Sequence, residues 1–393
     1  MPIRILIVGA GFVGLPIARR LKRSLGTRVD VTLIDAKDHF LFAPRLIDAL
    51  AGEVAEDQIK TDLSLIADRF DFHFIQGDVQ SIDRTKKRMR YIAQGKLPND
   101  ADSISYDYLV LCPGSKISYF NIPGSKEYTS SLKSLEDVYH IHGRVHELVA
   151  QAREKKTDTQ KAEIMNFVVV GGGASGVESL IALQQYVLRH CELHAPKLTP
   201  LVSFSLVNAA PQILTGFPLG SVRGAIKELT RRGVTLAMGE AVSCVENTCT
   251  VVTQSKRMSA SLTIWASGVT PNIIPTEPDI HRDDRGSMIT DAYLRVDPHT
   301  FAAGDAALYQ EQNVIIPKNG QTALLMSRSI SDNLIRSVKK QVLKPFHYKS
   351  KGSILWLGDT GFLNFGTFSL KSKFTPFLRE LFYRYRQWQI TKN

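Results

Sequence analysis

Two glycine-rich loops, each directly after a short apolar run, have the residue types and spacing needed to hold phosphates. Residues 9–14 and residues 171–176 both follow the pattern G-x-G-x-x-G. In this pattern the first glycine permits a tight turn, the second lets the backbone approach a diphosphate, and the third lets a helix pack closely on a strand. The diphosphate then lies at a helix N-terminus, where aligned peptide dipoles attract negative charge. The glycines are Gly9, Gly11 and Gly14 in the first loop and Gly171, Gly173 and Gly176 in the second.

The residue that closes the strand after each loop differs between the two. Asp35 closes the first such strand, where a carboxylate can accept hydrogen bonds from ribose hydroxyls. The corresponding residue after the second loop is Asn208, a neutral amide that does not repel a 2′-phosphate. No arginine stands beside Asn208 to bind such a phosphate, so the sequence favours NADH slightly and leaves NADPH open.

The elements around these loops predict β-α-β units. Apolar runs at Ile3–Val8 and Phe167–Val170 are typical of strands buried on both faces of a parallel sheet. Each is followed by glycines, a helical segment and a second strand, at Val29–Ile34 and Ser203–Val207 respectively.

A further strand, Phe301–Asp305, returns after the second unit and ends in Gly-Asp, which indicates that the second domain is inserted into the first. The predicted fold class is α/β, with two Rossmann-like dinucleotide-binding domains and a C-terminal amphipathic helical tail. The expected bounds are 1–125 with 285–345, 126–284 for the inserted domain, and 346–393 for the tail. The polar stretch Gln151–Lys161 is expected to be an exposed loop.

Glu178 follows the second glycine loop in the first turn of the predicted helix. A carboxylate there stabilises a helix dipole by about 0.3–1 kcal/mol, which is a sufficient structural reason for its presence. The alternative is a functional carboxylate near the reacting groups, and the residues alone do not decide between the two.

Composition sets broader limits. The chain has 393 residues, is 44% hydrophobic and 22% charged, and carries a net charge of +11, which suits a negatively charged partner or surface. The sequence has no run of about 18 apolar residues, so no membrane-spanning helix is expected. A strand is predicted from Ile3 onward, so no secretory leader is expected either. The four cysteines form no zinc pattern, so no metal site is expected, and no nucleic-acid-binding motif is recognisable.

Taken together, the motifs resemble those of the two-dinucleotide-binding-domain flavoproteins, the pyridine nucleotide–disulfide oxidoreductase superfamily, and most of all the type II NADH dehydrogenases, which are NADH:quinone oxidoreductases. The resemblance covers roughly residues 3–330 and rests on five motifs in family order. They are the first loop with Asp35, the strand and turn 108–114, the second loop with Glu178, the segment 268–272, and the segment 301–306.

The resemblance implies two bound cofactors, FAD and NAD(P)H. It implies that the first loop and Asp35 hold the ADP half of FAD, that Asp305 binds the ribityl chain, and that Val79 meets the adenine through its backbone. Segment 42–45, with Pro44, resembles the part of the family near the flavin ring. Gly268 would lie near the nicotinamide, and Glu178 near the nicotinamide and quinone sites. The remaining cofactor-binding positions by resemblance are Gly114, Gly304 and Asn208.

Two departures from the family pattern bear on the acceptor. Disulfide reductases of the superfamily carry a C-x4-C pair after the first glycine loop, whereas here the only such spacing, Cys244 and Cys249, falls in the second domain. A dithiol relay and sulfide oxidation are therefore not expected. In type II dehydrogenases an Ala-Gln-x-Ala-x-Gln segment helps to build the quinone site, and here Gln321 matches the first glutamine while the second position is apolar.

The tail from Phe374 to Trp388 places apolar and aromatic residues at helical spacing on one face, with Arg379 and Arg386 on its flank. Such a basic amphipathic helix suits an anionic membrane surface, and the resemblance points the same way. The alternative is a helix docked on the protein's own body or on a second subunit in a homodimer, with its arginines in water.

The expected function is hydride transfer from NAD(P)H to FAD and then transfer of two electrons to a quinone, without a redox-active disulfide and without proton pumping. We expect a peripheral protein on the cytoplasmic side of a membrane, or a soluble cytoplasmic one. The alternatives are a soluble NAD(P)H-dependent reductase of an iron–sulfur protein or of dioxygen, and a redox sensor similar to apoptosis-inducing factor.

Overall fold

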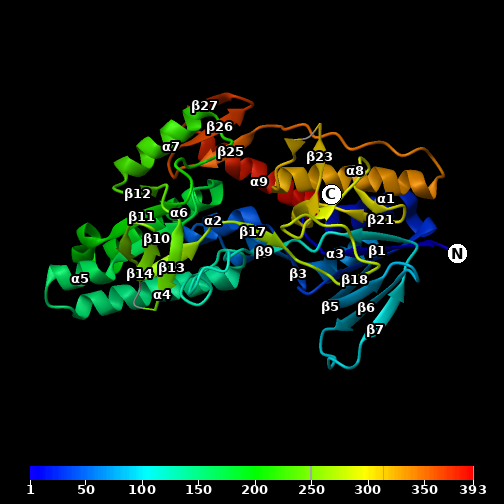
Figure 1. The fold of residues 1–393 in the computed structure, drawn as a ribbon, viewed down its shortest axis with the longest axis horizontal. Helices are drawn as coiled ribbons and strands as arrows, with labels where there is room; N and C mark the ends of the chain where they lie inside the picture. Colours follow the sequence, from blue (N-terminus) through cyan, green and yellow to red (C-terminus); the bar gives the residue numbers. More distant parts are fainter. Residues whose placement is uncertain (248–249, 313, 393) are drawn as a thin grey trace.

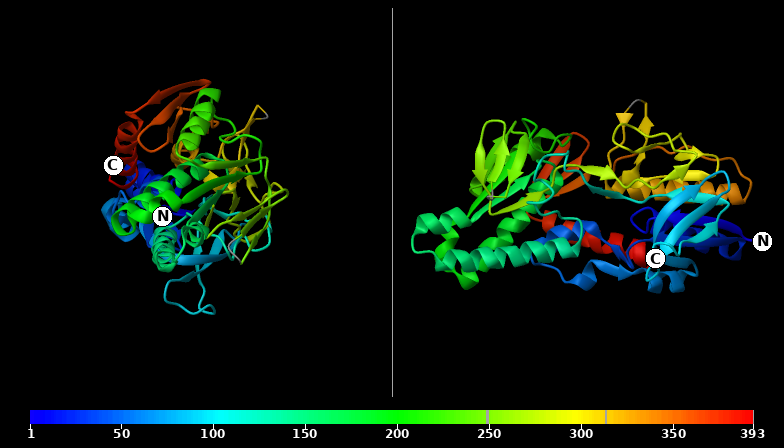
Figure 2. Two further views of the ribbon diagram at one scale, coloured as in Figure 1. Left: turned by 90° about the vertical axis from the view of Figure 1, so that its left-hand side faces the viewer. Right: turned by 60° about the horizontal axis from the view of Figure 1, so that its bottom comes forward.

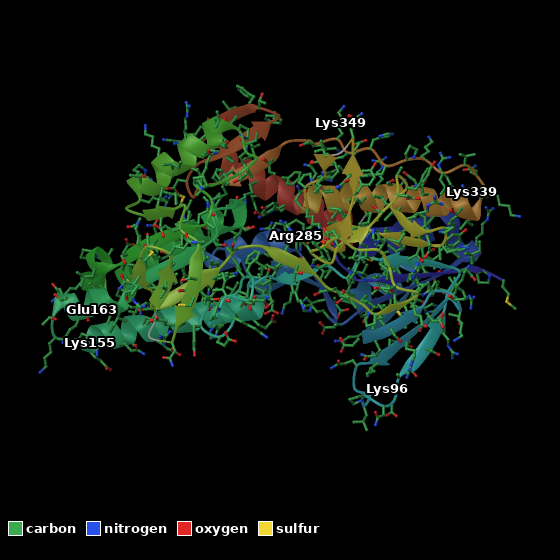
Figure 3. The ribbon with its side chains drawn as sticks, in the orientation of Figure 1. Lys96, Lys155, Glu163, Arg285, Lys339 and Lys349 are labelled. Carbon is green, nitrogen blue, oxygen red and sulfur yellow. The ribbon has the colours of Figure 1, made fainter. Side chains whose placement is uncertain are left out.

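The chain folds into two α/β units that lie beside each other, the first on the right and the second on the left of Figure 1. The computed structural model describes residues 1–247, 250–312 and 314–392. The first unit is built on a nine-stranded sheet and the second on a four-stranded parallel sheet. In Figure 3, Lys96 marks the outer edge of the first unit, while Lys155 and Glu163 mark the far end of the second.

Strand β1 (Ile3–Val8) runs through the middle of the first sheet, parallel to a neighbour on each side. Its residues from Ile5 to Val8 are buried because other elements cover both faces of the sheet. Helices α1 (Gly14–Leu25) and α8 (Gly320–Val338) pack on each other and share one hydrophobic core with β1. The strands in order are β20 (Arg295–Asp297), β21 (Thr300–Ala302), β8 (Tyr108–Leu111), β1, β2 (Val29–Asp35), β5 (His73–Asp83), β6 (Arg88–Ala93) and β7 (Asp102–Ser105), with β18 (Thr276–Glu277) paired to β5.

The first unit is completed by chain that lies after the second unit in the sequence. Strand β21 pairs in parallel with β8, with Thr300 opposite Leu109 and Ala302 opposite Leu111. All four strands of the second sheet lie between β8 and β21 in the sequence. The predicted insertion of one dinucleotide-binding unit into the other, and with it the fold class, is confirmed.

The second unit repeats the same parallel architecture on a smaller scale. Its sheet has the order β12 (Thr235–Met238), β11 (Ser203–Asn208), β10 (Asn166–Val170) and β16 (Leu262–Trp265). Its helices are α4 (Leu135–Glu154), α5 (Asp158–Ile164), α6 (Ala174–His194) and α7 (Leu219–Arg231), and an antiparallel sheet of β13 (Val242–Glu246), β14 (Thr250–Thr253) and β15 (Arg257–Ser259) adjoins it. Two strands, β9 (Ser115–Ile117) and β17 (Val269–Pro271), pair where the chain passes between the units.

The expectation of a loop at Gln151–Lys161 was wrong, because most of this polar stretch is helical. Helix α4 continues to Glu154 and α5 begins at Asp158. Thr157 caps α5 by accepting a hydrogen bond from the Gln160 backbone at 3.2 Å, and the Gln160 side chain accepts one from the Thr157 backbone at 3.4 Å. This capping box is a helix-start signal, and the polarity of the stretch reflects exposed helix surfaces rather than a loop.

Short elements fill the connections. They are β3 (His39–Leu41), α2 (Leu46–Leu50), β4 (Lys60–Asp62), α3 (Leu63–Phe70), β19 (Met288–Ile289), β22 (Ala307–Leu308), β23 (Gln310–Glu311) and β24 (Val314–Ile315), with single 3-10 turns such as Ala43–Arg45. Helix α2 comes from the first unit's part of the sequence but packs against α4 and α6 of the second unit, so it forms part of the contact between the units.

The C-terminal part contains the predicted helix and a small sheet that the sequence did not indicate. Strands β25 (Ser353–Trp356), β26 (Gly361–Phe365) and β27 (Phe368–Ser372) form an antiparallel meander, and α9 (Thr375–Thr391) follows. Across the described parts of the chain, none of the helices combines the length and apolar character needed to cross a bilayer.

Candidate functional site

The first glycine loop lies at the carboxyl end of β1, between β2 and β8, where open α/β sheets bind ligands. Gly9 has φ +102°, and a Cβ atom placed on it would lie 2.1 Å from the carbonyl oxygen of Cys112. A Cβ on Gly14 would lie 1.9 Å from the Gly9 oxygen, so this helix can approach the strand only with glycine. A Cβ on Gly11 would have no heavy atom within 4 Å, which leaves space over the loop for a diphosphate.

The second loop has the same division of roles. Gly171 has φ +120°, and its Cβ would lie 2.7 Å from the Ala266 oxygen. A Cβ on Gly176 would lie 1.8 Å from the Gly171 oxygen, while Gly173 faces open space. The two loops are therefore equivalent cradles, each with two sterically required glycines and one that opens the binding surface.

The acid after the first cradle and the amide after the second are both held by backbone groups. The Asp35 carboxylate accepts hydrogen bonds from the amides of Ala10 at 2.7 Å and Lys37 at 2.9 Å. The Asn208 side chain accepts from the Gly172 amide at 2.9 Å and donates to the carbonyl oxygens of Ala210 and Gln212. Asn208 thus shapes the second cradle, and it brings no negative charge to the ribose position.

The other predicted positions of the first unit lie on its strands or in the turns that follow them. Gly114 follows β8 with φ +72°, and Gly304 follows β21 with the same φ. Asp305 comes next, and its carboxylate accepts a hydrogen bond from the Ser115 hydroxyl at 2.6 Å. Pro44 lies in the turn before α2, and Val79 lies on β5 opposite Tyr91.

Two lysines beside Asp305 were missed by the sequence analysis. Lys133 lies 3.4 Å from the Ser115 hydroxyl, and burial lowers the pKa of its ammonium although Asp305 opposes the shift. Lys318 donates to the Asp305 carbonyl oxygen at 2.8 Å, and burial lowers its pKa as well. No short sequence motif identifies these lysines, because neither lies beside a glycine loop. They make the region around Asp305 suited to a partly anionic ligand.

Gly268 begins the pair of strands between the units and has an aromatic neighbour that the sequence did not reveal. Its φ is +81°, and a Cβ on it would lie 2.5 Å from the ring of Phe120. The Phe120 side chain is largely exposed, and both Phe120 and Asn121 have positive φ. An exposed aromatic ring therefore lies over the position that the resemblance assigns to nicotinamide.

Glu178 belongs to a cluster of charges at the contact between α2, α6 and the C-terminal part. Its carboxylate accepts a hydrogen bond from the Trp356 amide at 2.8 Å. Burial raises the pKa of Glu178, and the positive charge of Arg379 opposes that shift. Arg379 donates to the Asp48 carboxylate, and burial raises the pKa of Asp48 against the pull of Arg379 and Arg45.

The alternative of a helix docked on the protein body placed the arginines in water, and for Arg379 this is wrong. Its side chain is 6% exposed and that of Asp48 is 5% exposed. The guanidinium lies 5.1 Å from the ring centroid of Trp356 and 4.6 Å from that of Tyr383. Next to it, Glu380 accepts two hydrogen bonds from Arg45, at 2.9 and 3.0 Å. The helix therefore docks on the protein body through its charged residues.

Three polar atoms of this cluster are buried without a hydrogen-bond partner: Nε of Arg45, Oδ2 of Asp48 and Nη2 of Arg379. Buried polar atoms in folded proteins are usually satisfied, so these atoms leave capacity for a ligand. Together with the cradle at Gly9–Gly14, the open space over Gly11 and the acceptor Asp35, they are compatible with a flavin dinucleotide whose ring system reaches the junction of the units.

Gln321 does not project freely into this junction. Its amide group donates to the Gly352 carbonyl oxygen at 3.1 Å, and its oxygen accepts from the Lys351 amide at 2.9 Å. The side chain thus fixes the segment that leads to β25.

The described cysteines, Cys112, Cys191 and Cys244, are free thiols. Cys112 lies under the first cradle, donates weakly to the Gly9 oxygen at 3.4 Å, and has a pKa raised by burial. Cys249 lies outside the described residues. The Cys112 thiol is therefore a packed structural group and a poor nucleophile.

The fold and the two cradles define a pyridine-nucleotide-dependent flavoprotein. The chain matches the family described as pyridine nucleotide-disulphide oxidoreductase over residues 2–327, and it belongs to that family. It is 26% identical to external NADH-ubiquinone oxidoreductase 2 of Saccharomyces cerevisiae mitochondria, over 90% of this chain and 71% of that protein. It is also 26% identical to the type II NADH:quinone oxidoreductase of Haemophilus influenzae, over 98% of this chain and 93% of that one.

Solved structures agree with this assignment at the level of the fold. NDH2 from Plasmodium falciparum in complex with NADH superimposes with a TM-score of 0.88 at 18% identity, covering 100% of this chain and 96% of that one. The predicted superfamily, and the likeness to type II NADH dehydrogenases within it, are confirmed.

Proposed function

We propose that this chain is an FAD-dependent NAD(P)H:quinone oxidoreductase of the type II kind, which oxidises NAD(P)H and reduces a quinone without a redox-active disulfide. The observation that carries the proposal is the pair of sterically equivalent cradles on two units that meet at one buried charge cluster. We further propose that residues 1–125 and 285–345 hold FAD and that residues 126–284 hold NAD(P)H.

Each cradle has the groups needed for its nucleotide. The amides over Gly11 and the N-terminus of α1 would receive the FAD diphosphate, Asp35 its ribose, and Asp305 the ribityl hydroxyls. The amides over Gly173 and the N-terminus of α6 would receive the nicotinamide dinucleotide. When bound, FAD supplies the hydride and electron chemistry, and the protein supplies orientation and electrostatics.

The half-buried carboxyl of Glu178 is the group we assign to proton handling at the acceptor. Its pKa is raised, its position is fixed by the Trp356 amide, and it lies in the same charge cluster as Arg379 and Asp48. A two-electron reduction of a quinone also consumes two protons, so a carboxyl with a raised pKa near the acceptor suits this step. The names of the relatives support quinone as the acceptor.

The test is a pair of assays on the purified protein with its bound flavin. Anaerobic mixing with NADH or NADPH is expected to bleach the flavin absorbance, and steady-state turnover is expected with at least one quinone from a panel of naphthoquinones and benzoquinones. Bleaching without quinone turnover, but with reduction of a small iron–sulfur protein or of dioxygen, would favour the soluble reductase. A stalled charge-transfer complex would favour a redox sensor.

We also propose that α9 attaches the protein to an anionic membrane surface. Its outward face and the neighbouring strands expose ten large apolar side chains, and Lys371, Lys373, Arg384 and Arg386 belong to the same segment of the chain. A patch of this kind usually marks an interaction site, and adjacent cations strengthen binding to anionic lipid. The exposed apolar residues are Phe365, Phe368, Leu370, Phe374, Phe377, Leu378, Leu381, Phe382, Tyr385 and Trp388.

Co-sedimentation with vesicles tests the membrane proposal. Binding to vesicles that contain anionic lipid, weaker binding to neutral vesicles, and loss of binding in a Phe377→Ser/Trp388→Ser variant are expected. If the same double substitution instead converts a dimer to a monomer and vesicles do not bind, the face is an interface between two copies of the chain.

A further inference from the structure

After α8, the chain crosses from the first unit to the second and then back to the first. Figure 3 shows Lys339 at the outer end of the first unit and Lys349 farther along the extended segment that returns toward the second unit. Strands β25, β26 and β27 then lie beside α7, and α9 runs back toward α1 and α8, as both Figure 1 and the right-hand view of Figure 2 show. We call residues 353–392 the C-terminal module.

The strands of this module are built into the second unit. The ring of Phe362 lies over Gly224 of α7, where a Cβ would come within 2.0 Å of the ring. The Ser221 hydroxyl, also on α7, donates to the side chain of Asn364, and both groups are buried. Leu355 and Leu357 belong to the hydrophobic core of the second unit. The module and this unit therefore share a single packed interior.

The helix of the module is built into the first unit. Arg19 of α1 donates to the carbonyl oxygens of Gln389, at 2.9 Å, and of Ile390, at the end of α9. A cation at a helix C-terminus satisfies carbonyl groups that have no partner within the helix. The Arg19 side chain is 4% exposed and lies over Phe70, and Ile390 belongs to the core of the first unit.

We propose that the C-terminal module is a brace that sets the position of the nicotinamide unit relative to the flavin unit, with Arg19 and Ser221 as positioning residues for hydride transfer. The inference rests on the proposed function. Other contacts between the units, through α2 and through the β9–β17 pair, place them side by side. The module adds anchors buried in both cores, and it also delivers the Trp356 amide to Glu178.

Hydride transfer is sensitive to such positioning. The reacting atoms must come to about 3–3.5 Å, and a displacement of about 1 Å caused by a distant substitution can cost on the order of 100-fold in rate. Loss of an anchor at either end should therefore slow flavin reduction, although neither anchor touches a cradle glycine. A module that served only for attachment to a surface would have no such effect.

The experiment uses the full-length protein with its bound flavin. Arg19→Met and Ser221→Ala are compared with Arg88→Met, which loses hydrogen bonds to Ser103 on the outer sheet, and with Ser243→Ala, which loses one to Val252. Anaerobic rapid mixing over a range of NADH concentrations separates the limiting rate of flavin bleaching from the NADH dissociation constant. Flavin content and melting temperature are measured for each variant.

The limiting bleaching rate is expected to fall on the order of 10- to 100-fold in Arg19→Met and Ser221→Ala, with intermediate loss in Arg19→Lys and none in the controls. The NADH dissociation constant should change less than about threefold, because the second cradle is intact. If Arg19→Met loses flavin, the test of the brace rests on Ser221→Ala alone. Ser221 lies on α7 of the second unit, so its substitution is not expected to affect flavin binding by the first unit. Unchanged bleaching in flavin-loaded Ser221→Ala overturns the brace. A wild-type protein that bleaches with neither NADH nor NADPH overturns the proposed function instead.

Discussion

The contact between Arg379 and Asp48 gives the sharpest quantitative prediction. The two side chains are 6% and 5% exposed. Among the described residues, Arg379→Met leaves the buried carboxylate with Arg45, 3.9 Å away, as its one ion-pair partner. Breaking a buried ion pair by removing one partner costs about 3–5 kcal/mol. Because Arg45 still offsets part of the loss, we expect the free energy of unfolding to fall by about 3 kcal/mol at pH 7.

The loss should depend on pH in a definite direction. Burial already raises the pKa of Asp48, and removing Arg379 removes the charge that opposes this rise. An acid whose pKa is higher in the folded state than in the unfolded state binds its proton more tightly when folded, so its ionisation destabilises the fold as pH rises through this range. The difference between variant and wild type should therefore shrink as pH falls from neutral toward the unfolded pKa of about 3.9. Glu178, whose pKa is also raised by burial, acts in the same sense.

Urea unfolding followed by tryptophan fluorescence measures this loss, and Trp356 under the guanidinium reports on the site itself. Arg384→Met is the matched control, because Arg384 is on the same helix and pairs with Glu380 but is 69% exposed, and an exposed pair contributes only about 0.3–0.5 kcal/mol. A loss below about 1 kcal/mol in Arg379→Met, or a loss that is the same at pH 5 and pH 7, would refute the reasoning.

Three further outcomes are expected. Glu178→Gln should abolish the change of kcat with pH that protonation of the half-buried carboxyl produces in the wild type. A pH profile with a quinone acceptor measures this change, and an unaltered profile would assign the titration to another group. In Asn208→Glu, kcat/KM for NADH divided by kcat/KM for NADPH should rise by about tenfold, because a carboxylate repels the 2′-phosphate. The isosteric Asn208→Asp tests the same charge with less change in size. Iodoacetamide should leave turnover intact, since burial keeps Cys112 protonated and inaccessible, and rapid inactivation that Cys112→Ala abolishes would contradict this.

The cradles could be predicted from the sequence because their physics is local. A glycine that needs positive φ, such as Gly9, or that meets a backbone oxygen, such as Gly14, is required by contacts that the neighbouring strand and helix always provide. A strand such as Ile3–Val8, in which Arg4 is the one charged residue and Ile5 to Val8 are buried, likewise identifies a parallel sheet by itself. The insertion of one unit in the other followed from the strand that returns after the second unit, which the pairing of β21 with β8 confirms.

The environment of the tail could not be predicted, because it depends on partners hundreds of positions away. Helical spacing identified the apolar face of α9 correctly. The usual rule that the apolar face of a helix packs inward does not hold for α9. Arg379 and Glu380 found buried partners in Asp48 and Arg45, so the charged face packs inward and the aromatic face is exposed. For the same reason Gln321, which was predicted from a motif, proved to bind the backbone of residues 351 and 352.

The charge cluster is an inefficient way to stabilise a contact between units. Replacing a buried ion pair with apolar residues of similar volume is often neutral or stabilising. Charge complementarity alone therefore does not explain why Asp48, Arg45 and Arg379 are buried beside the half-buried Glu178. Under the function we propose, their unpartnered atoms and the raised pKa values of both carboxyls would suit a ligand whose charge changes during reaction. The helix that completes this cluster is the one whose outer face is apolar. In this protein, therefore, the surface we assign to the membrane lies on one face of α9, and Arg379, whose charge acts on the carboxyl we assign to the acceptor, lies on the other.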